Sequence, residues 1–293
     1  MQKNYLAYIF IIPSLIFIIS FLYFPMLNVF KYSLYNYNTQ KPFDIQFIGV
    51  DNFVKIFTGD TVFWNSLWIS FQWVLSNVII QAVLGLIVSS IFMQGFRGRG
   101  FLRTIAISPW AVSGVLTATM WSFIYNEHMG LLNDVLKNLG IISSNKPWIG
   151  SLSLSLPSTV IAEVWRGLPF FLIIFMSAMQ TVPIELYEAA TVDGAGRFKK
   201  FTNITMPFIK ETIVFACILR AIWTFNSVDL IYVLTNGGPV NRTTTLAMYV
   251  VRMAEKSGEF GYGSALAVIA FLILLIFAIV VLKLTNYGRD QMR

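Results

Sequence analysis

The chain has 293 residues, of which 56% are hydrophobic and only 12% are charged. This composition excludes an ordinary soluble globular protein and predicts a chain that crosses a membrane several times. The formal net charge of +7 is explained by membrane topology, so it does not require nucleic acid as a partner.

Six apolar stretches are long enough to cross a bilayer core, which takes about 20 residues of helix. In chain order they are Tyr5 to Phe30, Ser66 to Met93, Phe101 to Tyr125, Ser155 to Gln180, Phe208 to Leu234 and Ala265 to Leu284. We therefore predict an all-α integral membrane protein with six transmembrane helices. Residues 1–293 are expected to form a single transmembrane domain with its core at 66–285.

The basic residues predict how these helices are oriented. Six spans place both termini on one side of the membrane, where short segments hold more than half of the Lys and Arg and few acids. The basic residues on that side are Lys3, Arg97, Arg99, Arg103, Arg197, Lys199, Lys200, Lys210, Lys283, Arg289 and Arg293. Because positive residues gather in cytoplasmic segments, we expect both termini to lie in the cytoplasm.

The loop between the first two spans contains an amphipathic pattern. The apolar residues Val50, Phe53, Val54 and Phe57 share one face at helical spacing. This spacing predicts a short helix that lies on the outer membrane surface, anchors the loop there and leads into the second span.

The second span is unusually polar for a membrane helix. Asn77 and Gln81 are one turn apart and lie on the same face. Two roles fit this pattern: hydrogen bonding to a neighbouring helix, and lining of a polar cavity.

The sequence contains no grouping that is typical of an enzyme or of nucleotide binding. The loop GFRGRGFLR has glycines for a bend, but it lacks the Lys and the Ser or Thr of a phosphate-binding loop. The single histidine, His128, has no cluster of ligands around it, so no metal site is expected. If ATP powers this protein, a separate subunit must hydrolyse it.

The fourth predicted span holds Glu163 and Arg166, and the fifth holds Arg220 and Asp229. Ionisable groups at membrane depth are costly, so each should face the protein interior or a wet cavity. Glu163 and Arg166 can pair at their three-residue spacing, whereas Arg220 and Asp229 would point to opposite sides of a straight helix. A buried ion network that fixes helix packing and direct contact with a solute both fit these residues.

The polar segment at 185–207, ELYEAATVDGAGRFKKFTNITMP, separates two long apolar runs. Pro183 suits the first position of a short helix, with Glu188 among the acids of its first turn. Gly194 tolerates left-handed backbone, so the first helix should stop there and a second short helix should follow. Pro207 is expected to end the second helix.

The spacing E-A-A-x-x-D-G-A, followed by Phe201, Ile204 and Pro207, resembles the EAA loop of the permease subunits of ABC importers that depend on a substrate-binding protein. The resemblance implies that residues 181–207 form a cytoplasmic helix-turn-helix, which docks in a cleft of an ATPase subunit. Small alanines would allow close approach, and a carboxylate would meet a basic group there. The residues assigned to this coupling role are Glu185, Glu188, Ala189, Ala190, Asp193, Gly194 and Pro207.

The segment from Trp223 to Pro239, WTFNSVDLIYVLTNGGP, resembles the carbohydrate branch of these permeases, of the maltose, lactose and glycerol-phosphate importer type. An aromatic ring can stack on a sugar, and an amide can bind its hydroxyl groups. The candidate pathway residues are therefore Trp223, Asn226 and Tyr232, together with Asn77, Gln81, Glu163, Arg166, Arg220 and Asp229.

The resemblance implies an ATP-driven importer in a bacterial or archaeal plasma membrane. Its partners would be a second homologous permease subunit, two ATPase subunits, an extracytoplasmic solute-binding protein, membrane lipid and a sugar or oligosaccharide. ATP and Mg would be bound by the ATPase, so this chain is expected to bind no cofactor. Both a related chain and another copy of this chain fit as the second permease.

The alternative is a secondary transporter or channel that moves a small polar solute alone. Such proteins often contain internal repeats, and the two halves of this sequence show no convincing similarity to each other. The two arginines at membrane depth would also suit an acidic or phosphorylated solute, and a general structural role explains them equally well.

Overall fold

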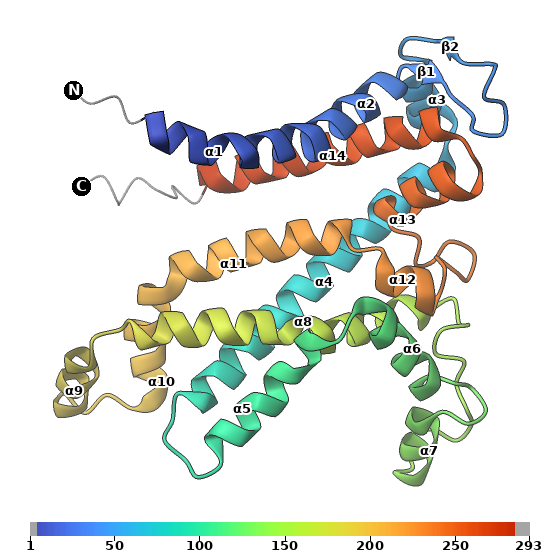
Figure 1. The fold of residues 1–293 in the computed structure, drawn as a ribbon. Helices are drawn as coiled ribbons and strands as arrows, with labels where there is room; N and C mark the ends of the chain where they lie inside the picture. Colours follow the sequence, from blue (N-terminus) through green and yellow to red (C-terminus); the bar gives the residue numbers. More distant parts are fainter. Residues whose placement is uncertain (1–4, 285–293) are drawn as a thin grey trace. The chain divides into compact units, whose positions relative to one another are not determined.

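The computed structural model describes residues 5–284, and Figure 1 shows that helices make up most of them, with loops between. The helices are α1 (Tyr5–Ile18), α2 (Phe24–Tyr32), α3 (Asp51–Gly59), α4 (Thr61–Phe92), α5 (Arg99–Ile107), α6 (Gly114–Ile124), α7 (Leu131–Asn138), α8 (Ser155–Gln180), α9 (Ile184–Val192), α10 (Arg197–Lys200), α11 (Met206–Asn226), α12 (Asp229–Leu234), α13 (Leu246–Val251) and α14 (Phe260–Leu284). Single turns of other helix types lie at Ile19–Tyr23, Ser108–Ala111, Phe201–Thr205 and Arg252–Lys256, and a two-stranded hairpin pairs β1 (Tyr35–Asn36) with β2 (Gln46–Phe47). The all-α prediction is confirmed.

The chain divides into two compact units. Of the described residues, the first holds 5–64 and Leu246–Leu275, and the second holds Asn65–Thr245 and 276–284. The single domain expected over residues 1–293 stays a prediction. The predicted cytoplasmic residues Lys3, Arg289 and Arg293, like the chain ends, lie outside the described residues.

Four of the predicted spans are confirmed as continuous helical segments. They are Phe10–Tyr32, Thr61–Phe92, Ser155–Gln180 and Phe260–Lys283, each long and apolar enough to cross a membrane. Long apolar runs decide these helices, because every backbone N–H and C=O in lipid must find its partner within the segment.

The third predicted span, Phe101 to Tyr125, is a bent pair and not one straight helix. The segment of α5 and its following 3₁₀ turn meets α6 at 104°. Pro109 has no N–H with which to continue the helix, and Ser113 caps α6 by accepting a hydrogen bond from the N–H of Leu116. Within residues 5–284 the structure thus has four spans, or five with this pair counted as one.

The fifth predicted span, Phe208 to Leu234, is also interrupted. α11 stops at Asn226 and α12 starts at Asp229, and of the two residues between them Ser227 takes an extended conformation with φ −74° and ψ 121°. α11 is more charged than the confirmed spans, since it carries Lys210, Glu211 and Arg220. The count of six spans is therefore not confirmed and stays a prediction.

In the first unit, hydrogen bonds to backbone carbonyls connect the hairpin and its flanking residues to neighbouring helices. Asn52 of α3 is buried, and its Nδ2 donates to the carbonyls of Ser33 at 2.9 Å and Tyr35 at 3.1 Å. Gly261 of α14 donates its N–H to the carbonyl of Tyr37 at 2.8 Å. A Cβ at Gly261 would lie 2.2 Å from the Tyr35 carbonyl oxygen, so only glycine permits this contact.

α3 confirms the short amphipathic helix expected after the first span. Its buried face carries Asn52 and Ile56, whereas Val50, Val54 and Phe57 are exposed. An apolar face that stays exposed beside a buried polar anchor suits a helix lying on a membrane surface.

Asp60 joins three helices of the first unit. Its Oδ1 accepts the N–H of Phe63 at 3.0 Å, and its Oδ2 accepts the hydroxyls of Tyr249 at 2.7 Å and Tyr262. Burial would raise the pKa of the Asp60 carboxyl, but the hydrogen bonds from Tyr262, Tyr249 and the backbone lower that pKa below its ordinary value. The folded state therefore favours the charged carboxylate.

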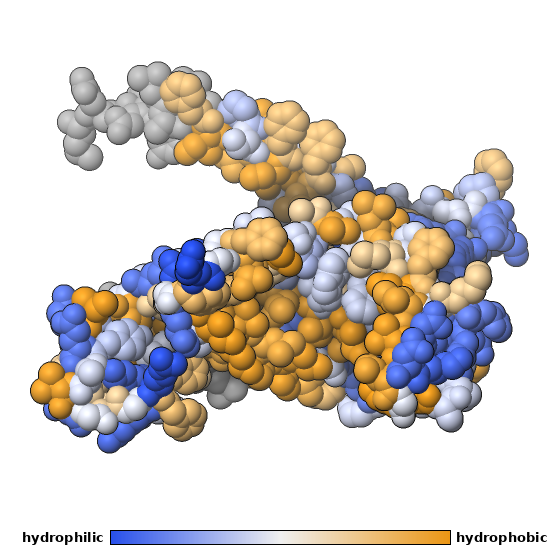
Figure 2. Space-filling model, turned by 90° about the horizontal axis from the view of Figure 1, so that it is seen from below, coloured by the Kyte–Doolittle hydropathy of each residue, from blue (hydrophilic) through white to orange (hydrophobic). Residues whose placement is uncertain are grey.

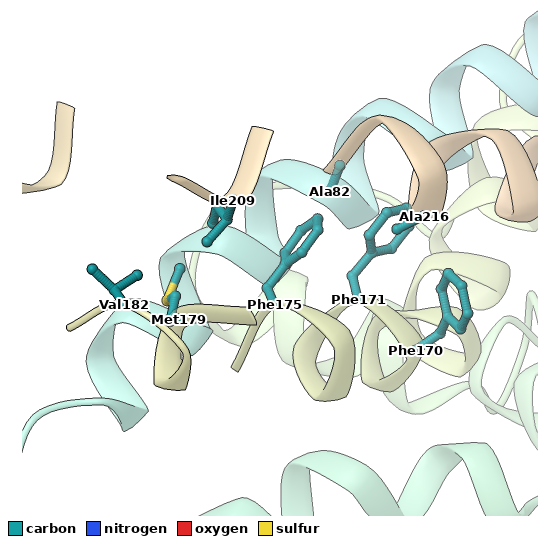
Figure 3. Packing of buried hydrophobic residues seen from close by; sticks show 8 residues of the cluster. All are labelled: Ala82, Phe170, Phe171, Phe175, Met179, Val182, Ile209 and Ala216. Carbon is teal, nitrogen blue, oxygen red and sulfur yellow. The ribbon is translucent and has the colours of Figure 1, made fainter. Parts of the chain in front are cut away.

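The core of the second unit is an aromatic seam along α8. Figure 3 shows Phe171 and Phe175 pointing from α8 toward α4 and α11, where Ala82 and Ala216 leave room for the rings. A Cβ at Gly85 of α4 would lie 2.6 Å from the Cβ of Phe171. Small residues at these positions let membrane helices approach closely, which is where their packing energy arises.

We predict that Asp60→Asn destabilises the first unit by about 1–2 kcal/mol at neutral pH, because an amide nitrogen cannot accept the tyrosine hydroxyls. Since folding lowers the pKa of Asp60, the stabilisation should be complete above about pH 4 and should be lost as the pH falls through the folded-state value. Thermal unfolding of the purified protein between pH 3 and pH 7 measures this. Asp51→Asn, at an exposed acid of α3, is the control and should leave the midpoint unchanged. If the unfolding midpoint of Asp60→Asn depends on pH in the same way as that of the parent protein, the role assigned to the Asp60 carboxylate is wrong.

Candidate functional site

Four charged side chains meet in the second unit, where α8, α11 and the start of α12 approach one another. Glu163 of α8 lies at their centre and is 1% exposed. Its Oε1 accepts from Nη2 of Arg220 at 2.7 Å, and its Oε2 accepts from Nε of Arg166 at 2.9 Å. The predicted pairing of Glu163 with Arg166 is confirmed. Two guanidinium groups on one carboxylate offset the cost of burying its charge.

Arg166 carries the network to the break between α11 and α12. Its Nη1 donates to Oδ2 of Asp229 at 2.8 Å, and its Nη2 donates to the hydroxyl of Ser227 at 3.2 Å. The expectation that Arg220 and Asp229 lie on one straight helix is wrong, because the chain breaks at Ser227. Their direct partners differ, but both belong to one network through Glu163 and Arg166.

A polar residue of α4 completes the network. Oε1 of Gln81 accepts from Nε of Arg220 at 2.7 Å, and Nε2 of Gln81 donates to the backbone carbonyl of Glu163 at 3.0 Å. Asn77, one turn earlier, donates to the carbonyl of Trp73 at 2.8 Å, and both amides are completely buried. Gln81 thus bonds to two neighbouring helices, and a role of either amide in a solute pathway stays a prediction.

Two glycines that sequence reasoning missed allow the charged groups to meet. A Cβ at Gly167 would lie 2.0 Å from Nη2 of Arg220, and a Cβ at Gly114 would lie 1.6 Å from Oδ2 of Asp229. Gly167 directly follows Arg166 in a membrane span, and this position beside a buried charge could have indicated its role. Gly114 is remote in sequence, so nothing there indicated its contact.

The network is electrically balanced and graded in exposure. It contains two acids and two arginines, so its formal charge is zero. The side chain of Glu163 is 1% exposed and that of Arg220 is 9% exposed, whereas that of Asp229 is 41% exposed. Among the described residues, no group of three or more His, Cys, Asp or Glu could hold a metal ion. The arrangement can hold helices in register, with its Asp229 end accessible to water.

The three candidates for sugar contact flank the same break. Trp223 and Tyr232 are 49% and 39% exposed, and Asn226 is exposed at the end of α11. The ring of Trp223 packs edge-on against Phe170 of α8, with ring centres 5.1 Å apart. Their surfaces are thus available at the break, and their contact with a sugar stays a prediction.

The polar segment after α8 forms the expected helix, turn and second helix. α9 begins at Ile184, one residue after Pro183, so Glu185 lies in its first turn but Glu188 does not. Gly194 turns the chain with φ +75°, as expected from its freedom in the left-handed region. The other residues assigned to coupling lie on this segment: Ala189, Ala190 and Asp193.

Pro207 does not end the second helix, contrary to the prediction. α10 runs through the π turn Phe201–Thr205 directly into α11, and Pro207 lies in the first turn of α11. A proline is tolerated at the start of a helix, where its missing N–H would have no partner. The turn is therefore joined to α11 without a loop.

The α9–α10 segment is packed against the core of the second unit. The hydroxyls of Tyr187 and Thr205 are 2.8 Å apart, and Nζ of Lys200 donates to the hydroxyl of Thr191 at 2.6 Å. The side chains of Tyr187, Phe201 and Ile204 also pack on the aromatic seam of α8. A force applied to α9 would thus reach α8 and α11 through packed side chains.

The outer surface of α9 and α10 mixes charge with exposed apolar residues. Glu185, Glu188 and Ala189 are exposed, as are Ile184 at 66%, Val192 at 90% and Phe198 at 80%. Figure 2 shows the face of the second unit on which hydrophobic residues fill the middle and hydrophilic residues gather at both ends. The α9–α10 segment and the basic loop before α5 lie at the same end of this unit (Figure 1).

Comparison with known proteins places this geometry in a family. Residues 81–286 match the model of the family described as binding-protein-dependent transport system inner membrane component. The trehalose/maltose transport system permease protein MalF of Thermococcus litoralis is 35% identical, over 97% of this chain and 95% of that protein. The diacetylchitobiose uptake system permease protein NgcF of Streptomyces coelicolor is 30% identical, over 96% of this chain and 82% of that protein.

The fold also resembles a solved structure. A chain of a bacterial ABC transporter involved in the import of the acidic polysaccharide alginate superposes with a TM-score of 0.85 at 20% identity, covering 98% of this chain and 97% of that chain. At this identity the likeness concerns the fold. The family match and the sequence relatives cover nearly all of the described helices. The chain is therefore a multi-pass membrane protein and belongs to the family of inner membrane components of binding-protein-dependent transport systems.

Proposed function

We propose that this chain forms part of the membrane pathway through which a sugar or oligosaccharide is imported. The printed functions of its relatives concern trehalose and maltose, diacetylchitobiose, and multiple sugars. The exposed rings of Trp223 and Tyr232 and the amide of Asn226 supply the stacking and hydrogen-bonding groups that a sugar requires. These residues flank an interrupted helix, where irregular membrane backbone is tolerated if it lines a cavity.

The observation that carries the coupling role is that the α9–α10 segment is exposed on one side and packed on the other. Its carboxylates and apolar side chains face outward, whereas Tyr187 and Phe201 pack on the core. We infer that α9 docks in a cleft of an ATPase subunit, with Glu188 meeting a basic group there. We infer further that the α9–α10 segment and both termini lie in the cytoplasm, which is the arrangement that six spans and the basic residues predict.

The complete importer would contain this chain, a second homologous permease, two ATPase subunits and an extracytoplasmic solute-binding protein. A solved alginate importer was determined in complex with its oligosaccharide-bound periplasmic protein, which supports the last of these partners. ATP and Mg would be bound by the ATPase subunits, and this chain would supply no catalytic residue. Closure of the ATPase pair would draw the coupling helices together and reopen the pathway to the outside.

We predict that Glu188→Lys leaves the protein inserted in the membrane but lowers sugar uptake at least about tenfold, because reversing the charge removes a charge-assisted contact. Uptake of labelled maltose or trehalose and recovery of the ATPase with the tagged chain would be measured together. Asp134→Lys, at an exposed acid of α7, is the matched charge reversal and should have no effect. Normal uptake and normal ATPase recovery in Glu188→Lys would count against docking through α9.

We predict that Trp223→Ala raises the sugar concentration needed for half-maximal uptake by about threefold to tenfold, because an aromatic contact of about 0.5–1.5 kcal/mol is lost. Trp223→Phe retains a ring against Phe170 and should have a smaller effect. Trp68→Ala removes an indole of similar exposure from α4 and serves as the control. If Trp223→Ala and Trp68→Ala behave alike, Trp223 does not contact the sugar.

A further inference from the structure

The second halves of the two interrupted segments pack on each other. α6 follows the break at Val112, α12 follows the break at Ser227, and α12 lies against α6. Each helix is short, and each is joined to its preceding helix through non-helical backbone. The two helices can therefore turn together about their two breaks without unwinding α5 or α11.

Both helices pack on α8, and the hydroxyl of Tyr125, which follows α6, donates to the carbonyl of Ser158 of α8 at 2.8 Å. At the other end of the pair, the polar contacts to α8 come from Arg166. Arg166 donates to Asp229, the first residue of α12, at 2.8 Å, and to Ser227 in the break at 3.2 Å. Gly114, the first residue of α6, is in contact with the same ion pair. A Cβ at Gly114 would lie 1.6 Å from Oδ2 of Asp229 and 2.3 Å from Nη1 of Arg166. Three segments thus meet at one guanidinium group.

The two ends of this joint differ in how firmly they are held. Arg166 is fixed on its own helix by Glu163, which is held in turn by Arg220, and the Arg166 side chain is 16% exposed. The Asp229 side chain is 41% exposed. Water can therefore solvate Asp229 if it leaves Arg166, whereas Glu163 has no such compensation. The bond between Arg166 and Asp229 is the one that can open at low cost.

We propose that Arg166 is a positioning residue that holds α6 and α12 on α8 as one unit, and that this unit pivots when the Arg166–Asp229 ion pair opens. The proposal does not depend on which solute is carried or on where the ATPase docks. It assigns the buried half of the network to fixed packing and the exposed half to movement.

Distances between spin labels on the complete protein test this directly. With Cys217 replaced by Ala, one label pair joins α6 to α12 at positions 119 and 233, and a second joins α6 to α8 at positions 119 and 161; Thr119, Val233 and Ile161 are all exposed. In Asp229→Asn we expect the α6–α12 distances to stay narrowly distributed and the α6–α8 distances to broaden. Unchanged α6–α8 distances, or equal broadening of both pairs, would overturn the proposal.

Glycine substitutions provide a second test that leaves every charge in place. Gly114→Ala should displace the ion pair and reproduce the broadened α6–α8 distances, with uptake reduced about as much as in Asp229→Asn. Gly100→Ala, in α5 of the same bent pair, adds the same methyl group where no atom lies within 4 Å and should match the parent protein.

Arg166→Lys should resemble Asp229→Asn, because an ammonium group cannot span Glu163, Ser227 and Asp229 at once. Narrow α6–α8 distances in both Gly114→Ala and Arg166→Lys would also overturn the proposal.

Discussion

The burial of Glu163 between two arginines is the interaction on which the second unit depends. A lone carboxylate at 1% exposure would be far too costly in a membrane protein, and removal of either arginine would leave charge uncompensated. Because Arg220 comes from α11 and Arg166 from α8, the requirement for charge balance fixes the register of these helices. Gln81 extends the same constraint to α4 through its two hydrogen bonds.

The aromatic seam and the charge network hold different parts of α8 in different ways. Toward the α9 end, Phe171, Phe175 and Met179 belong to an apolar cluster whose contacts have no fixed direction. At the network, hydrogen bonds of 2.7 to 2.9 Å on Glu163 demand a single geometry. α8 is thus held by apolar packing at one end and by directed hydrogen bonds at the other. It can therefore transmit motion along its axis without rotating about that axis.

Much of this could be predicted from the sequence, for physical reasons that also explain the failures. Long apolar runs predicted four spans, and the three-residue spacing predicted the pair of Glu163 with Arg166. The breaks near Pro109 and Ser227 were missed, because hydrophobicity measures length and says nothing of where a helix must stop. At Pro207 the sequence predicted a helix end where the structure has a helix start, because proline is common at both positions. The contact of Gly114 with the network depends on tertiary structure and had no local signal.

The exposed apolar residues on α9 and α10 have a consequence for the abundance of this subunit in the cell. Val192 at 90% and Phe198 at 80% exposure leave a surface that water solvates poorly, on a segment that contains a glycine turn. A partner that covers this surface hides it from proteases and from nonspecific association. An orphan copy of the chain would display it continuously, so the abundance of the permease would be set by the abundance of its partner.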